Sequence, residues 1–256
     1  MSIKIEGVSK RYDTGLLALD DISLEIGDHE FVCILGPSGC GKSTLLNIIA
    51  GLDKPSDGRV LADGNQINGP SNSRAMMFQS PSLFPWLTVI ENIKFGLKLK
   101  KLPKSEQDNI ANKFLKLIKL EEFRDYNVHQ LSGGMRQRVT LARALALESP
   151  YILMDEPFSS LDKQTINILR EELESLWRQL KNTIIYVTHS VEEAIFFADR
   201  IVMLSANPGR IKRIFDINLP RPRKIDDDEV VRLRSMILKE LRYEVELSEE
   251  KEKAAR

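Results

Sequence analysis

The chain has 256 residues, 42% of them apolar and 29% charged, which are ordinary values for a globular protein of one or two domains. Lysine plus arginine and aspartate plus glutamate both number 37, so the formal net charge is zero and nucleic acid is disfavoured as the main partner. Two cysteines are too few for a disulfide framework, and no window approaches the roughly 20 apolar residues of a membrane span. The N-terminus has no signal-peptide pattern, so we expect a soluble intracellular protein.

Short apolar runs alternate with helix-period segments along the chain, which is typical of a parallel sheet covered by helices. Strands are predicted over residues 31–35, 151–154, 183–188 and 201–204. Two predicted helices each have one apolar face, formed by Ile110, Phe114, Leu117 and Ile118 and by Ile168, Leu169, Leu173 and Leu176. Residues 81–150 contain no convincing strand, which favours a helical insertion, and residues from about 226 onward favour one long helix that ends in a charged tail.

A glycine-rich segment follows the first of these strands and precedes an apolar helix over residues 45–50. Glycines allow consecutive main-chain N–H groups to face an anion, and the start of the next helix adds positive potential. Lys42 can reach the terminal phosphates of a nucleotide, and the Ser43 hydroxyl can ligate Mg²⁺. The segment matches the phosphate-binding loop G-x-x-x-x-G-K-[ST] and consists of Gly36, Pro37, Ser38, Gly39, Cys40, Gly41, Lys42, Ser43 and Thr44. We therefore predict that the chain binds a nucleoside triphosphate.

Two adjacent carboxylates, Asp155 and Glu156, follow the predicted strand over residues 151–154. A buried strand that brings carboxylates to its C-terminal end is what metal-assisted phosphoryl transfer requires. We expect Asp155 to hold Mg²⁺, directly or through water, and Glu156 to polarise the attacking water. Such a pair alone is more often an ordinary loop start, and the phosphate-binding loop upstream makes the catalytic interpretation the better one.

A third segment, Leu131-Ser132-Gly133-Gly134 with Met135-Arg136-Gln137-Arg138, precedes a predicted helix. Ser132 is a good N-cap, and the two glycines leave the first N–H groups of the helix open to an anion. Alone this pattern is more often a plain turn, but here it closely resembles the signature sequence of ATP-binding cassette (ABC) ATPases.

Other positions resemble the same family in order and spacing. Gln79 ends residues 74–78 like the family's glutamine loop, and Ser159-Ser160-Leu161-Asp162 resembles its aspartate loop. His189 follows the predicted strand over residues 183–188 like the switch histidine, and Tyr12 resembles the aromatic residue that stacks on adenine. Singly these residues carry little information, and their joint order carries the inference. The resemblance extends from about residue 3 to residue 211.

The resemblance implies an α/β fold: a P-loop NTPase (RecA-like) core with a β-rich N-terminal part and an inserted α-helical subdomain. We expect an ABC ATPase domain over residues 1–225, with its core at about 1–80 and 151–225 and its helical subdomain at about 81–150. Residues 226–256 are expected to form a C-terminal helical extension.

The resemblance also implies a mechanism. Two cassettes would face each other head to tail and bind each ATP between the phosphate loop of one and the signature helix of the other. Ser132, Gly133, Gly134 and Asp162 would then act in trans. Lys42, Glu156 and His189 are the expected catalytic residues, and Ser43, Gln79 and Asp155 the expected Mg²⁺ site, with Gln79 also reporting to the membrane partner.

The partners implied are a second ATP-binding subunit, expected to form a homodimer with this one, separate transmembrane permease subunits and, indirectly, an external solute-binding protein. The location implied is the cytoplasmic face of the cell (inner) membrane, as a peripheral subunit. Residues 84–89, 205–211 and 219–223 resemble the nitrate, sulfonate and taurine importer branch, which implies a small anion or similar solute.

Three alternatives remain at this point. The chain could be the ATPase of an exporter with separate membrane subunits, or a non-transport ABC ATPase that works on chromosomes or ribosomes. The absence of a heptad run and of a second cassette in the sequence disfavours the latter. A third alternative is a scaffold that does not hydrolyse ATP, and the presence of Lys42, Asp155, Glu156 and His189 disfavours it.

Overall fold

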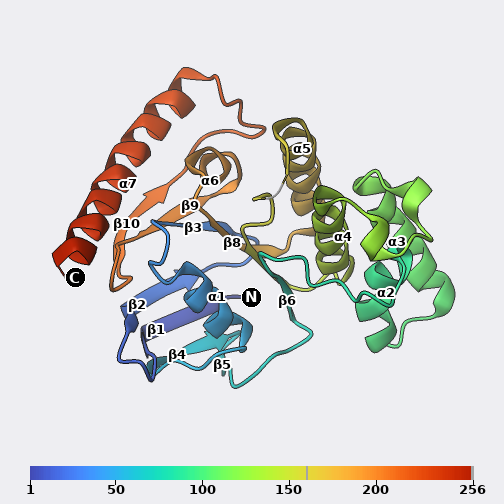
Figure 1. The fold of residues 1–256 in the computed structure, drawn as a ribbon, viewed down its shortest axis with the longest axis horizontal. Helices are drawn as coiled ribbons and strands as arrows, with labels where there is room; N and C mark the ends of the chain where they lie inside the picture. Colours follow the sequence, from blue (N-terminus) through green and yellow to red (C-terminus); the bar gives the residue numbers. More distant parts are fainter. Residues whose placement is uncertain (160, 255–256) are drawn as a thin grey trace. The chain divides into compact units, whose positions relative to one another are not determined.

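The computed structural model describes residues 1–159 and 161–254, with side chains described as far as residue 248. Ser160 of the expected aspartate loop and the last two residues of the expected C-terminal helix lie outside the described residues. The chain divides into two units (Figure 1). The first comprises Met1–Ser71 and the chain from Thr183 onward, and the second comprises Asn72–Asn182. The expected domain limits at 80, 150 and 225 stay a prediction.

The N-terminal part of the first unit is a four-stranded antiparallel sheet in the order β2-β1-β4-β5. Its strands are β1 (Ile3–Arg11), β2 (Leu17–Ile26), β4 (Asp57–Ala62) and β5 (Asn65–Gln66). In β2, buried Ile22, Leu24 and Ile26 alternate with exposed residues, as expected for a strand with one face on the core. Ile3 in β1 pairs with both Ile26 and Ala62, which places β1 in the middle of the sheet.

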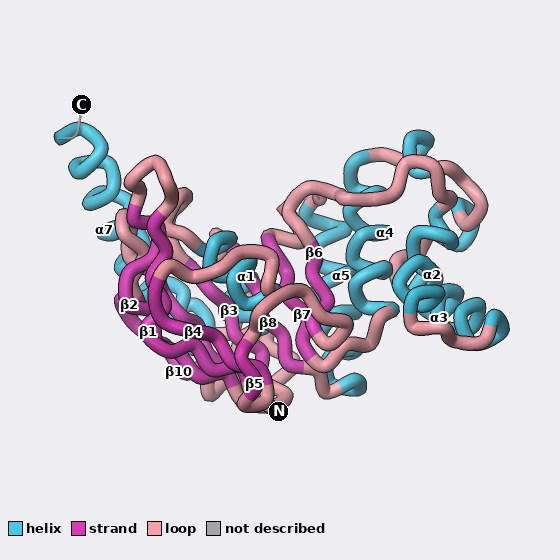
Figure 2. The backbone as a smooth tube through the Cα atoms, turned by 90° about the horizontal axis from the view of Figure 1, so that it is seen from below, coloured by secondary structure: helices cyan, strands magenta, loops and turns pink. Residues whose placement is uncertain are grey.

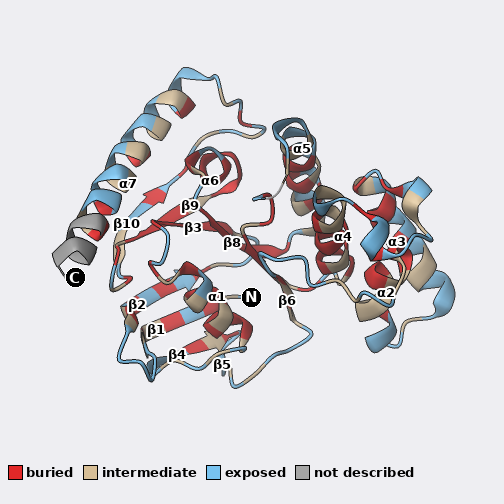
Figure 3. Cartoon of the chain, viewed as in Figure 1, coloured by how far each residue is buried: buried red, intermediate tan, exposed pale blue. Residues whose placement is uncertain are grey.

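The second set of strands in this unit surrounds β3 (Phe31–Leu35), which is buried along its whole length (Figure 3). It pairs in parallel with β8 (Thr183–Thr188) and β9 (Arg200–Leu204), and β10 (Ile211–Asp216) pairs antiparallel to β9. Continuous apolar runs are what strands covered on both faces require. The strands predicted over residues 31–35, 183–188 and 201–204 are therefore confirmed.

Three helices complete the first unit: α1 (Lys42–Ala50), α6 (Val191–Phe197) and α7 (Asp228–Ala254). An aromatic group of Phe31, Tyr186 and Phe197 joins α6 to β3 and β8, with ring centroids 5.1 to 5.9 Å apart. The helix α7 packs against α6, and its position confirms the long helix expected from about residue 226.

The second unit contains two parallel strands, β6 (Arg74–Met77) and β7 (Tyr151–Asp155), and the helices drawn in Figure 2. These are α2 (Val89–Leu99), α3 (Lys104–Leu117), α4 (Gly133–Ala146) and α5 (Lys163–Leu180), with 3₁₀ turns at Glu121–Phe123 and Val128–Gln130. Within residues 78–150, all of which are described, every named element is helical, as the sequence predicts.

Two expected apolar faces are partly wrong. In α3 the buried residues are Ala111, Phe114 and Leu115, while Ile110 and Leu117 are half-buried. In α5, Leu169, Leu173 and Leu176 are buried as expected, but Ile168 is exposed. Each error is a rotation of about one residue, because adjacent apolar residues leave the centre of a helix face undetermined until its neighbour is known. Among the residues described, no helix has both the length and the apolar character that a membrane span demands.

Candidate functional site

The glycine-rich loop between β3 and α1 is shaped for close main-chain approach. Gly39 and Gly41 adopt φ values of 77° and 92°, a region in which side chains are strained. A Cβ on Gly36 would lie 2.7 Å from Cys40 Sγ and 3.0 Å from the Leu204 carbonyl oxygen, so this position also needs glycine. Gly41 then directly precedes α1, whose first N–H groups have no partner in the preceding turn of helix. This cradle fits an oligophosphate.

Lys42 is the charged group of the loop and is buried with it. Its Nζ donates hydrogen bonds to the carbonyl oxygens of Gly36 and Pro37 at 2.9 and 2.8 Å. The ammonium is therefore held beside the cradle by acceptors that an anion could replace. Cys40 is 1% exposed, and burial raises the pKa of its thiol, an effect that nearby Lys42 opposes.

Ser43 and Thr44 of the loop, together with Tyr12 before β2, are the other candidate nucleotide-binding residues of the first unit. Ser43 is exposed at the start of α1, so its hydroxyl is accessible to a ligand. The Tyr12 hydroxyl and Thr44 Oγ1 are 3.2 Å apart, which places the Tyr12 ring beside the loop. Tyr12 is 38% exposed, and Lys10 Nζ lies 5.1 Å from the centroid of its ring. An exposed aromatic ring at this place can stack on a base.

The second unit carries the carboxylates. Asp155 ends β7 and is buried, and Glu156 follows with φ of 45°, a conformation that costs a non-glycine residue energy. Glu156 Oε2 accepts a hydrogen bond of 3.2 Å from Gln79 Nε2. The structure thus brings together Gln79 and Glu156, two residues 77 positions apart that the motifs had placed in one site.

The signature segment starts α4 as expected. Ser132 is the N-cap, and its Oγ accepts the Met135 N–H at 3.2 Å. Gly133 has open space around its Cα, whereas a Cβ on Gly134 would lie 3.2 Å from Leu161 Cδ2. An anion can therefore approach the helix at Gly133. Gly134 lets the helix pack against the aspartate loop.

The aspartate loop ends at Asp162, which is the N-cap of α5. Its Oδ1 accepts the Thr165 N–H at 3.0 Å. Hydrogen bonding to Thr165 lowers the pKa of the Asp162 carboxyl.

His189 lies in the first unit, in the short turn between β8 and α6. Its side chain is exposed, while its neighbours are fixed: Ser190 N–H donates to Thr188 Oγ1 at 3.0 Å, and Thr188 Oγ1 donates to Glu193 Oε2 at 2.9 Å. The turn therefore displays an imidazole on a rigid support.

Sequence reasoning missed Gln137. This residue is buried in α4, and its Nε2 donates to the Pro157 carbonyl at 3.0 Å, which ties the signature helix to the segment after Glu156. The sequence carries no sign of this burial, because Gln137 lies between Arg136 and Arg138.

Residues 19–159, more than half of the chain, match the family described as ABC transporter. The chain belongs to this family. It is accordingly an ATP-binding protein and an ATPase, and the resemblance inferred from the motifs is confirmed.

Curated relatives of this ABC protein include transport subunits. An uncharacterized ABC transporter ATP-binding protein of Methanocaldococcus jannaschii is 49% identical over 248 residues, which are 96% of this chain and 93% of the relative. A nitrate import ATP-binding protein of Synechocystis is 47% identical over 205 residues, 80% of this chain and 77% of the relative. An aliphatic sulfonates import ATP-binding protein of Bacillus cereus is 41% identical over 243 residues, 94% of this chain and 96% of the relative.

Solved ABC cassettes confirm the expected fold class. A dimeric cassette in a post-hydrolysis state bound to ADP and Pi has a TM-score of 0.77 and 35% identity, covering 85% of this chain and all of that one. Another solved cassette, cbiO1 of Clostridium perfringens, is described as part of the ABC transporter complex cbiONQ. It has a TM-score of 0.75 and 28% identity, covering 92% of this chain and 98% of that one. The α/β P-loop NTPase fold is thereby established.

Proposed function

We propose that this ABC ATPase powers the import of a small solute, namely an anion such as nitrate, a sulfonate or taurine. The observation that carries the ATPase part is the phosphate cradle at Gly36–Thr44 with Lys42 folded against it. The importer part rests on the relatives named as nitrate and sulfonate import proteins, which match at 47% and 41% identity.

In the proposed mechanism the main-chain N–H groups of the loop and Lys42 bind the phosphates of ATP, while Tyr12 stacks on the base. Ser43, Gln79 and Asp155 would hold Mg²⁺, which neutralises phosphate charge in such sites. Among the described residues, no group of three or more histidine, cysteine or acidic side chains is placed to hold a metal ion. Mg²⁺ at nucleotide sites is usually bound by one or two protein oxygens together with phosphate and water.

Glu156 is the proposed general base and His189 the residue that contacts the terminal phosphate. The hydrogen bond from Gln79 to Glu156 supports a shared task, since it gives the carboxylate a defined orientation. Lys42 would stabilise charge that develops on the transferred phosphate.

The active form proposed is a dimer of cassettes. Ser132, Gly133, Gly134 and Asp162 would act on the nucleotide of the partner cassette, because the start of α4 is a second anion-receptive helix terminus in one chain. A solved relative is described as dimeric with ADP and Pi bound, which is consistent with this arrangement.

Permease subunits are the proposed membrane partners, with an external solute-binding protein delivering the solute. The proposed location is accordingly the cytoplasmic face of the membrane. Trp86 follows Gln79 by seven residues in the sequence and supports a docking site there, because it is 72% exposed while its ring lies 5.5 Å from that of Phe84. We propose that residues 84–87 receive a permease segment.

The ATPase mechanism is tested with Glu156→Gln and Lys42→Ala. Loss of the general base should slow hydrolysis by about 10²–10⁴-fold, or roughly 3–5 kcal/mol of barrier, and should trap an ATP-bound dimer in gel filtration. Lys42→Ala should abolish ATP binding and therefore yield no dimer. Wild-type turnover in a correctly folded Glu156→Gln variant would refute the role of Glu156.

The importer is tested by purifying the ATPase with its neighbouring permease and screening nitrate, sulfonates and taurine against the cognate binding protein. Solute-loaded binding protein should stimulate the ATPase of the complex. Trp86→Ala with Leu87→Ala should uncouple hydrolysis from transport while the isolated ATPase keeps its activity. A permease that works without any binding protein would favour the exporter alternative, and unaltered coupling would reject the docking site.

A further inference from the structure

The loop between β9 and β10 is closed on itself. Ser205 N–H donates to the Arg210 carbonyl at 2.9 Å, and Arg210 N–H donates to Ser205 Oγ at 3.1 Å. Ser205 Oγ in turn donates to the Pro208 carbonyl at 3.0 Å. These bonds make residues 205–210 a compact turn that moves as one piece.

The tip of this turn lies against the phosphate loop and its neighbour β2. Gly209 N–H donates to the Ala18 carbonyl, and Asp20 N–H donates to the Gly209 carbonyl, both at 3.0 Å. A Cβ on Gly209 would lie 2.2 Å from the Cys40 carbonyl oxygen, so the two backbones are in direct contact. The position of the turn therefore limits where the peptide group of Cys40 can lie.

The other end of the turn is held by α7 through Glu244. Glu244 is buried, with 5% of its surface exposed. Its Oε2 accepts the Ala206 N–H at 3.1 Å, and its Oε1 accepts from Lys212 Nζ at 2.6 Å. Ala206 is in the turn and Lys212 follows it, so one carboxylate joins both ends. A buried carboxylate is tolerated when it is hydrogen-bonded in this way, which makes the contact directional.

We propose that Glu244 is a positioning residue for the phosphate loop, acting through residues 205–210 on the Cys40 peptide group. The inference rests on the proposed role of residues 36–44 in binding ATP. The C-terminal helix α7 would then contribute to nucleotide binding, although Glu244 is 200 residues after Thr44 at the end of the phosphate loop. Without the carboxylate the turn is free to shift, and the phosphate loop loses the backbone that lies against Cys40.

The test uses the thiol of Cys40 in the full-length protein. Because Cys40 is 1% exposed, a thiol reagent reaches it when the loop opens, and the labelling rate reports the opened population. Peptide mass spectrometry separates it from Cys33, which is fully buried in β3. Glu244→Asp keeps the charge and shortens the reach to Ala206, while Glu244→Gln keeps an acceptor oxygen at full length.

We expect Glu244→Asp to raise the labelling rate of Cys40 about tenfold, the usual effect of losing one charged hydrogen bond. The affinity for a non-hydrolysable ATP analogue should fall as well, by a smaller factor, because the fraction of the loop that is competent to bind decreases. Glu244→Gln can keep the hydrogen bond from the Ala206 N–H, but its amide N–H₂ then faces Lys212 Nζ and the ion pair is lost. Its labelling rate should therefore fall between those of wild type and Glu244→Asp.

Two matched controls separate positioning from general destabilisation. Glu240→Ala removes another acid of α7 that pairs with Lys212, at 3.5 Å, and with Arg213, at 3.1 Å. Val230→Ala creates a small cavity under the buried start of α7, distant in the helix from Glu244. Neither should change Cys40 labelling by more than about twofold, even where the unfolding temperature falls.

A labelling rate of Cys40 in Glu244→Asp within twofold of wild type would overturn the proposal, as would equal acceleration in Val230→Ala. Failure of the proposed function is distinguishable, because it would appear as Lys42→Ala binding the analogue as tightly as wild type. In that event the labelling of Cys40 without nucleotide still decides the role of Glu244.

Discussion

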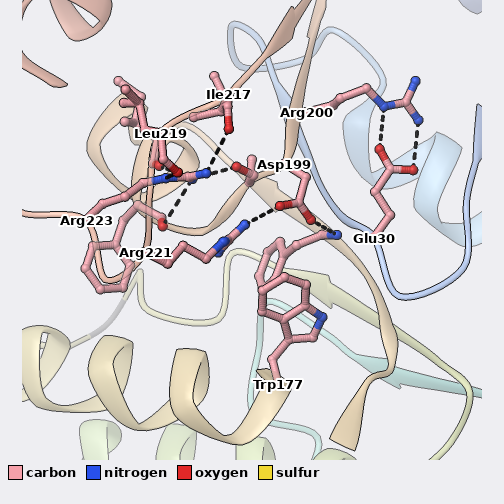
Figure 4. A network of polar contacts seen from close by, with 12 residues as sticks. Glu30, Trp177, Asp199, Arg200, Ile217, Leu219, Arg221 and Arg223 are labelled. Atoms are coloured by element: carbon pink, nitrogen blue, oxygen red, sulfur yellow. Dashed lines mark hydrogen bonds and ion pairs between the residues drawn. The ribbon is translucent and has the colours of Figure 1, made fainter. Parts of the chain in front are cut away.

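Replacing Arg223 should destabilise the first unit more than replacing any ordinary surface arginine. The guanidinium of this residue, which is 5% exposed, donates to main-chain carbonyls at the end of α6 and after β10 (Figure 4). Nη1 bonds the oxygens of Ile195 at 2.7 Å and Ala198 at 2.6 Å, and Nη2 bonds that of Ile217 at 3.0 Å. Arg223 therefore caps a helix whose last carbonyls are buried.

The expected magnitude follows from those three contacts. Arg223→Met leaves the buried carbonyls of Ile195, Ala198 and Ile217 without their donor, and each unsatisfied acceptor costs about 1–3 kcal/mol. Relaxation and entry of water reduce the sum, so we expect a loss of about 3–5 kcal/mol in the free energy of unfolding. Arg223→Lys keeps a charge and up to three donors but not the planar fork, and should lose about half as much.

Urea denaturation and thermal unfolding measure this effect. A loss of that size should lower the unfolding temperature of a chain this long by roughly 6–20 °C. Arg213→Met is the control, because the Arg213 side chain is 49% exposed and pairs with a partly exposed Glu240, a contact worth about 0–1 kcal/mol. If Arg223→Met unfolds within about 1 kcal/mol of that control, the capping role is refuted.

Three further predictions concern the nucleotide site. Tyr12→Ala should weaken ATP binding by about 1–3 kcal/mol in a titration, and Tyr12→Phe should change it little, because stacking uses the ring and not the hydroxyl that lies 3.2 Å from Thr44. Thiol reagents should inactivate the ATPase by modifying Cys40, and bound ATP should protect the enzyme. Burial raises the pKa of this thiol, so the rate of inactivation should keep rising above pH 9. Equal rates with and without ATP would contradict the placement of Cys40 in the nucleotide site. Hydrogen bonding to Thr165 lowers the pKa of the Asp162 carboxyl, so this group stabilises the fold above the unfolded pKa near 3.8, and the stabilisation is lost as pH falls through the folded pKa. The unfolding temperatures of wild type and Asp162→Asn should therefore converge in acid. A constant difference down to about pH 2 would count against the capping role of Asp162.

The strands and the residue order of the site could be predicted from sequence because their signals are local. β3 and residues 184–187 of β8 are continuous runs of apolar residues. The phosphate loop is a contiguous segment in which Gly39 and Gly41 adopt the positive φ values that favour glycine. Ser132 and Asp162 were expected in the site as parts of motifs, and both prove to be N-caps with a bonded N–H three residues later. Interactions between residues this close in sequence can be predicted from a short segment of the chain.

The residues that escaped prediction act at long range. Glu244 bonds Ala206, 38 positions away, and Gln137 bonds Pro157, 20 positions away. A glutamate in a charged helix and a glutamine among arginines carry no sign of burial, because helix rotation decides which side chains face inward. The same uncertainty of rotation misplaced Ile168, which the apolar pattern had assigned to a buried face.

Ion pairs in the first unit explain what the equal numbers of positive and negative residues mean for the phosphate loop. Arg200 pairs with Glu30, Arg221 with Asp199 and Lys212 with Glu244, and each pair joins residues at least 22 positions apart in the sequence. Cations committed to such pairs add little field at the phosphate loop, whose recognition of an anion then depends on main-chain N–H groups and on Lys42. A site built in this way depends on backbone position more than on net charge. The elements that fix that backbone, the turn at residues 205–210 and the helix behind it, are therefore where distant substitutions should change affinity for ATP.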